Sequence, residues 1–245
     1  MITIGTVVEG PSDRLVLEAI LEQIYQDEIR YIPIQPLSNQ DFGKHGPGWW
    51  GVKKWCEETW QLKGSSLEKL LSGDTGSPLD VLVIQVDAEI AFDSNLQKGF
   101  NPIIDDVQQV CPPIQPTIAN LKQIIAAGWL QKDDLPPQVI LAIPAQDTEN
   151  WTFAALFPDD ALCAAADYEC PKLGQHWRDR PGYRLTRKKY GQLLEFKAGK
   201  IKKSKRRYEA LISQIADNWD TVRTICSQAE QFDQDIRNLL TPEAH

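Results

Sequence analysis

Short runs of apolar and β-branched residues, each followed by turn residues, constrain this chain more than any other feature. The clearest run is 80–86, Asp-Val-Leu-Val-Ile-Gln-Val, and similar runs occupy residues 2–8 and 138–143. Continuous apolar runs of this length are typical of strands buried on both faces. Apolar residues then recur at helical spacing over about 13–27. The alternation of strands and helices predicts an α/β fold with a largely parallel sheet flanked by helices.

Weaker patterns fill the rest of the chain. A further strand is expected at 30–35. Helices are expected at 51–63, 117–128, 147–156, 184–196, 202–218 and 220–240. Residues 41–51 are too rich in glycine for regular structure, so Trp49 and Trp50 are expected in a loop, where exposed indoles would suit a partner surface. We expect an α/β core over 1–160 and a basic, mostly helical C-terminal region over 161–245 that packs on it.

Acidic residues follow three of the predicted strands. Glu9 follows the first strand, Asp87 and Glu89 follow the clearest one, and Glu149 opens the helix after the last. The carboxyl ends of parallel strands meet at one edge of a sheet, so these acids are expected to converge there. In extended backbone, Asp87 and Glu89 would also point the same way. Taken singly, each acid is more commonly a helix cap or a solvated loop residue.

Clustered carboxylates repel one another and are stabilised by protonation or by hard cations. Mg²⁺ takes oxygen ligands and is commonly held by one or two carboxylates together with water and phosphate. Two such ions can stabilise both the attacking and the leaving oxygen of a phosphodiester displacement. The predicted cluster therefore indicates phosphoryl chemistry that depends on Mg²⁺, or on Mn²⁺ in its place.

Two motifs carry a family resemblance over residues 2–155. Val-Glu-Gly-Pro-Ser-Asp at 8–13 and Val-Asp-Ala-Glu at 86–89, each after a strand, resemble the motifs of the Toprim fold, which is Rossmann-like. The first motif looks most like the branch of the overcoming-lysogenization-defect nucleases. Pro144 to Trp151 is similar to an element of that branch which opens a helix. The second motif reads Asp-x-Glu, where the family prefers Asp-x-Asp.

The resemblance implies a role for each matching acid. Glu9 would be a metal ligand or general base, and Asp87 a metal ligand. Glu89 would take the place of the second family aspartate. Asp13 and Glu149 would be supporting metal ligands. The implied activity is that of a nuclease, in prokaryotic phage defence or DNA processing.

A basic segment lies in the C-terminal region. Residues 172–207 hold fourteen basic and two acidic residues, a net charge of +12 in a chain whose net charge is −8. Such asymmetry often marks a surface that binds a polyanion. The expected nucleic-acid contacts are Lys188, Lys189, Lys202, Lys205 and Arg206, and Lys202 or Lys205 could steady the charge of the transition state. The alternative is a solvated face that pairs with the acidic body.

The cysteines and the N-terminus bear on location. No Cys-x-x-C pair occurs, so we expect five reduced thiols in a cytoplasmic protein. They are Cys56, Cys111, Cys163, Cys170 and Cys226. The first ten residues read as a strand rather than a signal peptide, and no apolar run is long enough to span a membrane, so no membrane partner is expected.

Three functions stay open from the sequence. The first is a metal-dependent nuclease acting on nucleic acid, with DNA favoured over RNA. The second is a non-catalytic nucleic-acid-binding or regulatory module on the same fold, which the Asp-x-Glu departure favours. The third is a subunit acting with an ATPase partner, since the chain has no Walker motif. The resemblance also implies self-association into a homo-oligomer.

Overall fold

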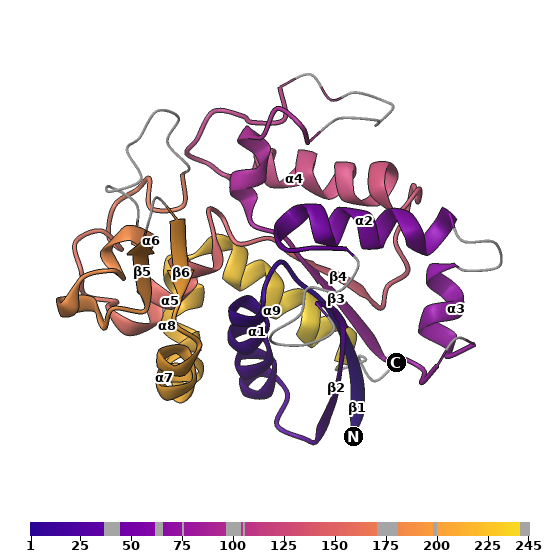
Figure 1. Cartoon of the computed structure of the whole chain (residues 1–245), viewed down its shortest axis with the longest axis horizontal. Helices are drawn as coiled ribbons and strands as arrows, with labels where there is room; N and C mark the ends of the chain where they lie inside the picture. Colours follow the sequence, from indigo (N-terminus) through magenta and orange to yellow (C-terminus); the bar gives the residue numbers. More distant parts are fainter. Residues whose placement is uncertain are drawn as a thin grey trace.

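The fold is built on one parallel sheet of four strands. The computed structural model describes residues 1–36, 45–61, 66–74, 76–96, 104, 106–170, 181–197 and 200–240. The strand order is β2-β1-β3-β4, and every neighbouring pair is parallel. The strands are β1 (Ile2–Val7), β2 (Ile29–Gln35), β3 (Val81–Gln85) and β4 (Val139–Ala142). The predicted α/β fold with a parallel sheet flanked by helices is confirmed, as Figure 1 shows.

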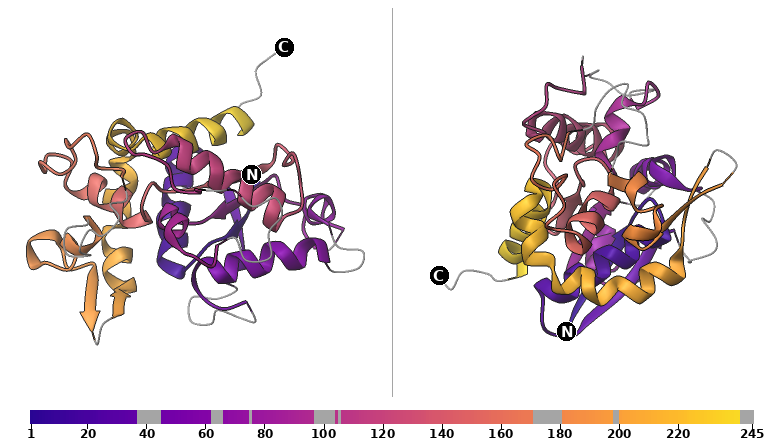
Figure 2. Two further views of the ribbon diagram at one scale, coloured as in Figure 1. Left: turned by 90° about the horizontal axis from the view of Figure 1, so that it is seen from above. Right: turned by 90° about the vertical axis from the view of Figure 1, so that its left-hand side faces the viewer.

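Helices pack on both faces of this sheet. One core contains residues of α1 (Pro11–Ile24), α5 (Thr148–Leu156), α7 (Lys205–Asp217), α8 (Trp219–Ile225) and α9 (Ser227–Leu240). The other core contains residues of α2 (Gly48–Gln61), α3 (Leu67–Ser72), α4 (Gln115–Gln123) and the π-helical turn η2 (Ile124–Trp129). Figures 1 and 2 show the sheet between these two layers.

The strand β3 shows why its sequence is apolar throughout. Val81 and Val83 face the core that holds α1, whereas Leu82 and Ile84 face the core that holds α2. All five residues of β3 are buried. Because β3 also lies between two other strands, it is covered on every side, and the polar side chain at Gln85 stands out as an exception.

The C-terminal region differs from the prediction of continuous helices. The predicted helix over 184–196 is wrong. Its place is taken by the short α6 (Pro181–Arg184), the 3₁₀ turn η4 (Lys188–Tyr190) and β5 (Leu194–Lys197). β5 pairs antiparallel with β6 (Lys200–Lys203), so the helix predicted to begin at 202 begins instead at Lys205. Leu-Glu-Phe-Lys alternates with period two, which is a strand pattern, although lysine-rich segments also suit helices. Figure 2 shows this hairpin projecting from one side of the molecule.

Other boundaries also move. The helix predicted over 220–240 is two helices, because the backbone at Cys226 is extended. The expected loop around Trp49 and Trp50 is wrong, since α2 begins at Gly48 and both indoles lie in its first turn.

None of the helices in the described part of the chain is long and apolar enough to cross a membrane.

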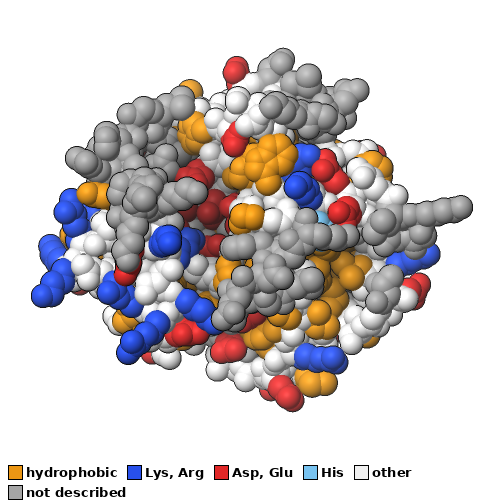
Figure 3. All heavy atoms as spheres, in the orientation of Figure 1, with side chains coloured by type: hydrophobic (Ala, Val, Ile, Leu, Met, Phe, Trp, Pro, Cys, Tyr) orange, Lys and Arg blue, Asp and Glu red, His pale blue; other side chains and the backbone are white. Residues whose placement is uncertain are grey.

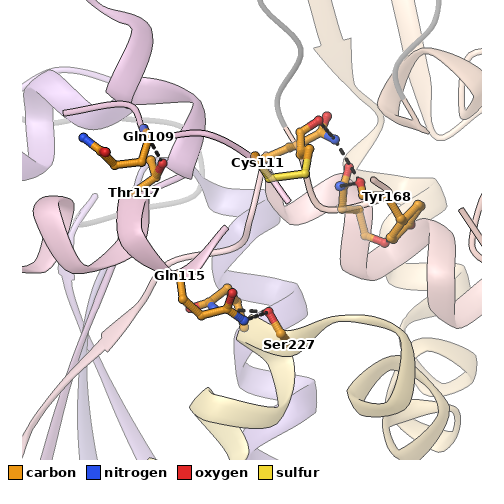
Figure 4. The surroundings of a disulfide bond; sticks show 10 residues. Gln109, Cys111, Gln115, Thr117, Tyr168 and Ser227 are labelled. Atoms are coloured by element: carbon orange, nitrogen blue, oxygen red, sulfur yellow. Dashed lines mark hydrogen bonds between the residues drawn. A yellow bond between two sulfur atoms is a disulfide. The ribbon is translucent and has the colours of Figure 1, made fainter. Parts of the chain in front are cut away.

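The expectation of five reduced thiols is wrong for two of them. Cys111 and Cys170 form a disulfide with an S–S distance of 2.03 Å. It ties the segment before α4 to the segment after α5 (Figure 4). The two cysteines are 59 residues apart, so their pairing depends on tertiary proximity that spacing alone does not reveal. Cys56, Cys163 and Cys226 are free and buried. The cytoplasmic expectation loses the argument that it drew from unpaired cysteines.

Candidate functional site

The predicted convergence of acids at the carboxyl edge of the sheet is seen for the first two strand ends. β1 and β3 are parallel neighbours, and Glu9 and Asp87 follow them. The Asp87 backbone N–H donates to Glu9 Oε1 at 2.8 Å. Gln85 links the same two ends, because its Oε1 accepts from the Glu9 N–H at 3.1 Å and its Nε2 donates to Asp87 Oδ1 at 2.8 Å. Two of these hydrogen bonds thus join the two strand ends, and the third, from Gln85 to Asp87, holds the Asp87 carboxylate at the end of β3.

The start of α5 closes the site from the next strand. Thr148 donates to Asp87 Oδ1 through its N–H at 3.2 Å and its hydroxyl at 3.3 Å. Asp147 caps α5 by accepting from the Asn150 N–H at 3.1 Å. The buried Glu149 follows in the first turn. The turn after β4 therefore brings Thr148 to Asp87 and places Glu149 in the same turn of helix.

Asp13 reaches the site from the first turn of α1 and is buried. Gly10 makes room for it, because a Cβ at Gly10 would lie 2.9 Å from Asp13 Oδ2. The Glu-Gly pair of the first motif therefore has a steric reason in this fold. A side chain at this position would require the Asp13 carboxylate to shift.

Lys203 is the cation that meets these acids. Its Nζ donates to Asp13 Oδ1 at 2.6 Å and lies 2.7 Å from Glu149 Oε1. The Tyr208 hydroxyl also donates to Glu149 Oε1, at 2.8 Å. The two carboxylates are 5% and 6% exposed and the lysine side chain 26%. The last residue of β6 therefore links α1 to α5 through one ammonium group.

Glu89 and the predicted basic contacts lie further out. The 3₁₀ helix η1 (Ala88–Phe92) begins directly after Asp87, so the extended backbone that would align Glu89 with Asp87 is not present. Glu89 is exposed, but its charge still acts on Glu9. The predicted nucleic-acid contacts are exposed as well: Lys188, Lys189, Lys202, Lys205 and Arg206. Lys205 pairs with Glu209 at 3.4 Å. Lys172, Arg178 and Arg180 of the basic segment lie outside the described residues.

Figure 3 shows the resulting surface. Acidic side chains gather in a hollow near the middle of the face shown, and basic side chains lie beside the hollow, on the side of the β5–β6 hairpin. The lysine in direct contact with the predicted acids Asp13 and Glu149 is Lys203, rather than Lys202 or Lys205.

The electrostatics of the site reflect crowded negative charge. The pKa of Glu9 is raised to about 8, mainly by burial; the hydrogen bond from Asp87 and the charge of Lys203 act to lower it, and the charges of Asp13 and Glu89 act to raise it. Burial, followed by the charges of Glu9 and Asp13, raises the pKa of Asp87 well above its usual value. For Lys203, burial lowers the pKa, but Asp13 and Glu149 outweigh it and hold the pKa well above its usual value.

The donor set suits a hard cation. Four carboxylates each keep one oxygen without a hydrogen-bond partner among the described residues: Glu9 Oε2, Asp13 Oδ2, Asp87 Oδ2 and Glu149 Oε2. No group of three or more His, Cys, Asp and Glu side chains in the described ranges is arranged as it stands to hold a metal ion. Among the described residues, no lysine or arginine forms an ion pair with Glu9 or Asp87, and Mg²⁺ is commonly held by one or two carboxylates.

Sequence reasoning missed four side chains of this site: Gln85, Thr148, Lys203 and Tyr208. Gln85 had a signal, because it is the one polar residue within an otherwise apolar strand. Lys203 could not be distinguished from its lysine neighbours, because its contact with Asp13 spans 190 residues of sequence.

The raised pKa values predict how stability depends on pH without metal. An unfolded Glu9 loses its proton near 4.5, and the folded one near 8. Between these values the folded state binds more protons, so the free energy of unfolding falls as pH rises. We expect a loss of roughly 2–4 kcal/mol between pH 5 and 8 for the pair of acids. Asp13, Glu89 and Asp147 strengthen the effect and Lys203 opposes it.

Urea unfolding in EDTA at several pH values measures this dependence. Glu9→Gln cannot titrate at this position and should show a flatter profile. A wild-type stability that rises over the same window, or an equal slope in Glu9→Gln, would contradict the assignment of the shifted pKa to Glu9.

The fold and the site together define an α/β protein with an acidic site at the carboxyl edge of its sheet. No family model, curated protein or solved structure matches this chain.

Proposed function

We propose that this chain is a Mg²⁺-dependent phosphodiesterase that acts on nucleic acid, with Mn²⁺ able to replace Mg²⁺, on a Toprim-like core. The observation that supports this most is the arrangement of Glu9, Asp13, Asp87 and Glu149, each with one oxygen unpartnered by the described residues. The Glu-Gly motif and the Asp-x-Glu motif follow adjacent parallel strands. The resemblance to the overcoming-lysogenization-defect branch suggests a role in prokaryotic defence or DNA processing.

A few residues would bind the cation and keep its ligands in place. Glu9 and Asp87 would hold the cation, and Asp13, Glu149 and Glu89 would support it through their charge. The bound cation would activate water and neutralise the phosphodiester. Gln85 and Thr148 hold Asp87 Oδ1, which leaves Oδ2 for binding.

Lys203 is the cation of the chain that already lies at the acids. A phosphate oxygen that replaces one of its carboxylate contacts would receive its hydrogen bond, and the ammonium would then steady the charge that develops there. The exposed Lys188, Lys189, Lys202, Lys205 and Arg206 would hold neighbouring phosphates without reading sequence.

The test is cleavage of labelled single-stranded DNA, duplex DNA and RNA, together with the small diester bis(p-nitrophenyl) phosphate. Each substrate is incubated with Mg²⁺, Mn²⁺ or EDTA. We expect cleavage with either metal and none in EDTA. Absence of cleavage of every substrate with both metals would contradict the proposal.

A second candidate is a non-catalytic nucleic-acid-binding module. It is favoured by the ammonium of Lys203, which already neutralises Asp13 and Glu149, and by the exposed position of Glu89. It predicts binding that weakens as salt rises, without metal-dependent turnover. A chain that neither cleaves nor binds alone would instead favour a subunit that acts with an ATPase partner.

A further inference from the structure

Three indole rings form a stack on the α2 side of the molecule. The ring centroids of Trp49 and Trp50 are 4.2 Å apart with an interplanar angle of 22°, and those of Trp49 and Trp129 are 6.2 Å apart at 14°. Trp129 is buried, whereas Trp50 at the other end is 39% exposed. The stack therefore runs from the buried Trp129 to the exposed Trp50, and Trp49 packs against the Trp50 indole.

The helix α2, which carries Trp49 and Trp50, begins at the acidic site. The Gly48 N–H donates to the Glu9 carbonyl oxygen at 3.0 Å, and a Cβ at Gly48 would lie 3.8 Å from Glu9 Oε2. Figure 1 shows α2 starting near the carboxyl end of β1. Trp50 is two residues further along, which is a rise of about 3 Å. The first turn of α2, which carries Trp49 and Trp50, therefore starts beside Glu9.

The geometry of the stack suits a planar ligand. Trp49 covers one face of Trp50 and holds the indole in place before any ligand arrives. The Lys53 ammonium, which pairs with Glu57, lies over the Trp50 ring, 5.8 Å from its centroid, and brings positive charge to it. A base could extend this ordered stack by one ring, and stacking of this kind tolerates any base because each has a π face. In a duplex, both faces of an internal base are already covered by its neighbours.

We propose that Trp50, supported by Trp49, stacks on an unpaired base of the nucleic acid whose backbone lies at the acidic site. The proposal rests on the proposed function and narrows its substrate to single strands, or to duplexes with an unpaired end or flap. Two different elements reach the acidic residues: Lys203 of β6 contacts Asp13 and Glu149, and Gly48 at the start of α2 contacts Glu9. A strand could therefore meet cations on one side and an aromatic ring on the other.

Trp50→Ala is the informative variant and Trp60→Ala its matched control. Trp60 is 41% exposed on the same helix, roughly 15 Å further along its axis, and its Nε1 donates to the Trp129 carbonyl oxygen. Trp50→Phe keeps an aromatic ring at the position. Thermal unfolding of all three variants checks that they fold.

The measurement is binding of a fluorescein-labelled oligothymidylate in Ca²⁺, with gels to confirm that the strand stays intact. Trp50→Ala should bind roughly 5- to 150-fold more weakly than the wild type. Trp50→Phe should recover most of the loss, and Trp60→Ala should bind like the wild type. A blunt, fully paired duplex should bind equally to all four proteins.

Several results would overturn the stacking proposal. They are wild-type affinity in Trp50→Ala, an equal loss in Trp60→Ala, an equal loss for the blunt duplex, or no binding of the oligothymidylate by the wild type. Hydrolysis of bis(p-nitrophenyl) phosphate by the wild type tests the proposed function separately from the stacking proposal. A wild type that does not hydrolyse it would count against the catalytic proposal, whereas the binding comparison needs no turnover.

Discussion

Asp87→Asn is expected to lower Mg²⁺-dependent cleavage by roughly 100- to 1,000-fold, the range found when one preorganised electrostatic group is removed from an active site. Asparagine has the same shape and can still accept from Thr148 through its carbonyl oxygen. It lacks the negative charge that would hold a cation beside Glu9. The loss should therefore appear in turnover while the fold is kept. Cleavage of bis(p-nitrophenyl) phosphate and thermal unfolding measure the two effects separately.

Asp80→Asn is the matched control for this variant. Asp80 directly precedes β3, at the end of the strand away from Asp87, and its Oδ2 accepts from the Thr3 N–H at 2.7 Å. The same substitution there should reduce stability by about 1 kcal/mol and leave turnover within about twofold of the wild type. Equal losses of turnover in the two variants, or none in Asp87→Asn, would argue against a catalytic role for the acidic site.

Lys203→Met is expected to lower the free energy of unfolding by roughly 2–4 kcal/mol. Removing one partner of a buried ion pair commonly costs about 3–5 kcal/mol, because the other charge is left without compensation. The expected value is smaller because the lysine side chain is 26% exposed. Asp13 and Glu149 would both lose their cation, and the contact from β6 to α1 and α5 would be lost with it.

Lys202→Met tests whether this loss depends on position. Lys202 is the preceding residue of β6 and is exposed, so the same change there should alter stability by less than about 0.5 kcal/mol. Added Mg²⁺ should restore part of the stability of Lys203→Met, since a cation can occupy the site of the lost ammonium. Urea unfolding with and without Mg²⁺ measures both. Similar stability of the two variants would show that the Lys203 contacts contribute little.

The parts of the fold that sequence predicted well are those buried on both faces. The runs at β1, β3 and β4 are apolar because helices cover both sides of the sheet, so their sequences report strand position directly. The hairpin β5–β6 was missed because its strands are short and rich in lysine, and lysine also favours helices. Burial on both faces accounts for the apolar sequences of β1, β3 and β4. The strands of the hairpin are instead recognised by their pairing with each other.

Some contacts of the acidic site could likewise be predicted from the sequence, and others could not. Contact between Glu9 and Asp87 follows from parallel strands that end at one edge, and it was predicted on that ground. The alignment of Glu89 with Asp87 failed because the chain turns into a 3₁₀ helix one residue after the strand. The contacts of Lys203 with Asp13 and Glu149 and the disulfide of Cys111 with Cys170 join segments far apart in sequence, and only the assembled fold brings them together.

Calorimetric titration with Mg²⁺ at pH 7.5 measures whether the acids at the sheet edge bind a divalent cation. The wild type should bind Mg²⁺ and release protons, since the pKa of Glu9 lies at about 8 and cation binding favours the ionised carboxylate. Repeating the titration in buffers of different ionisation enthalpy gives the number of protons released. Asp87→Asn should bind far more weakly, and Asp80→Asn like the wild type. Absence of Mg²⁺ binding by the wild type, or equal binding by Asp87→Asn, would contradict the account.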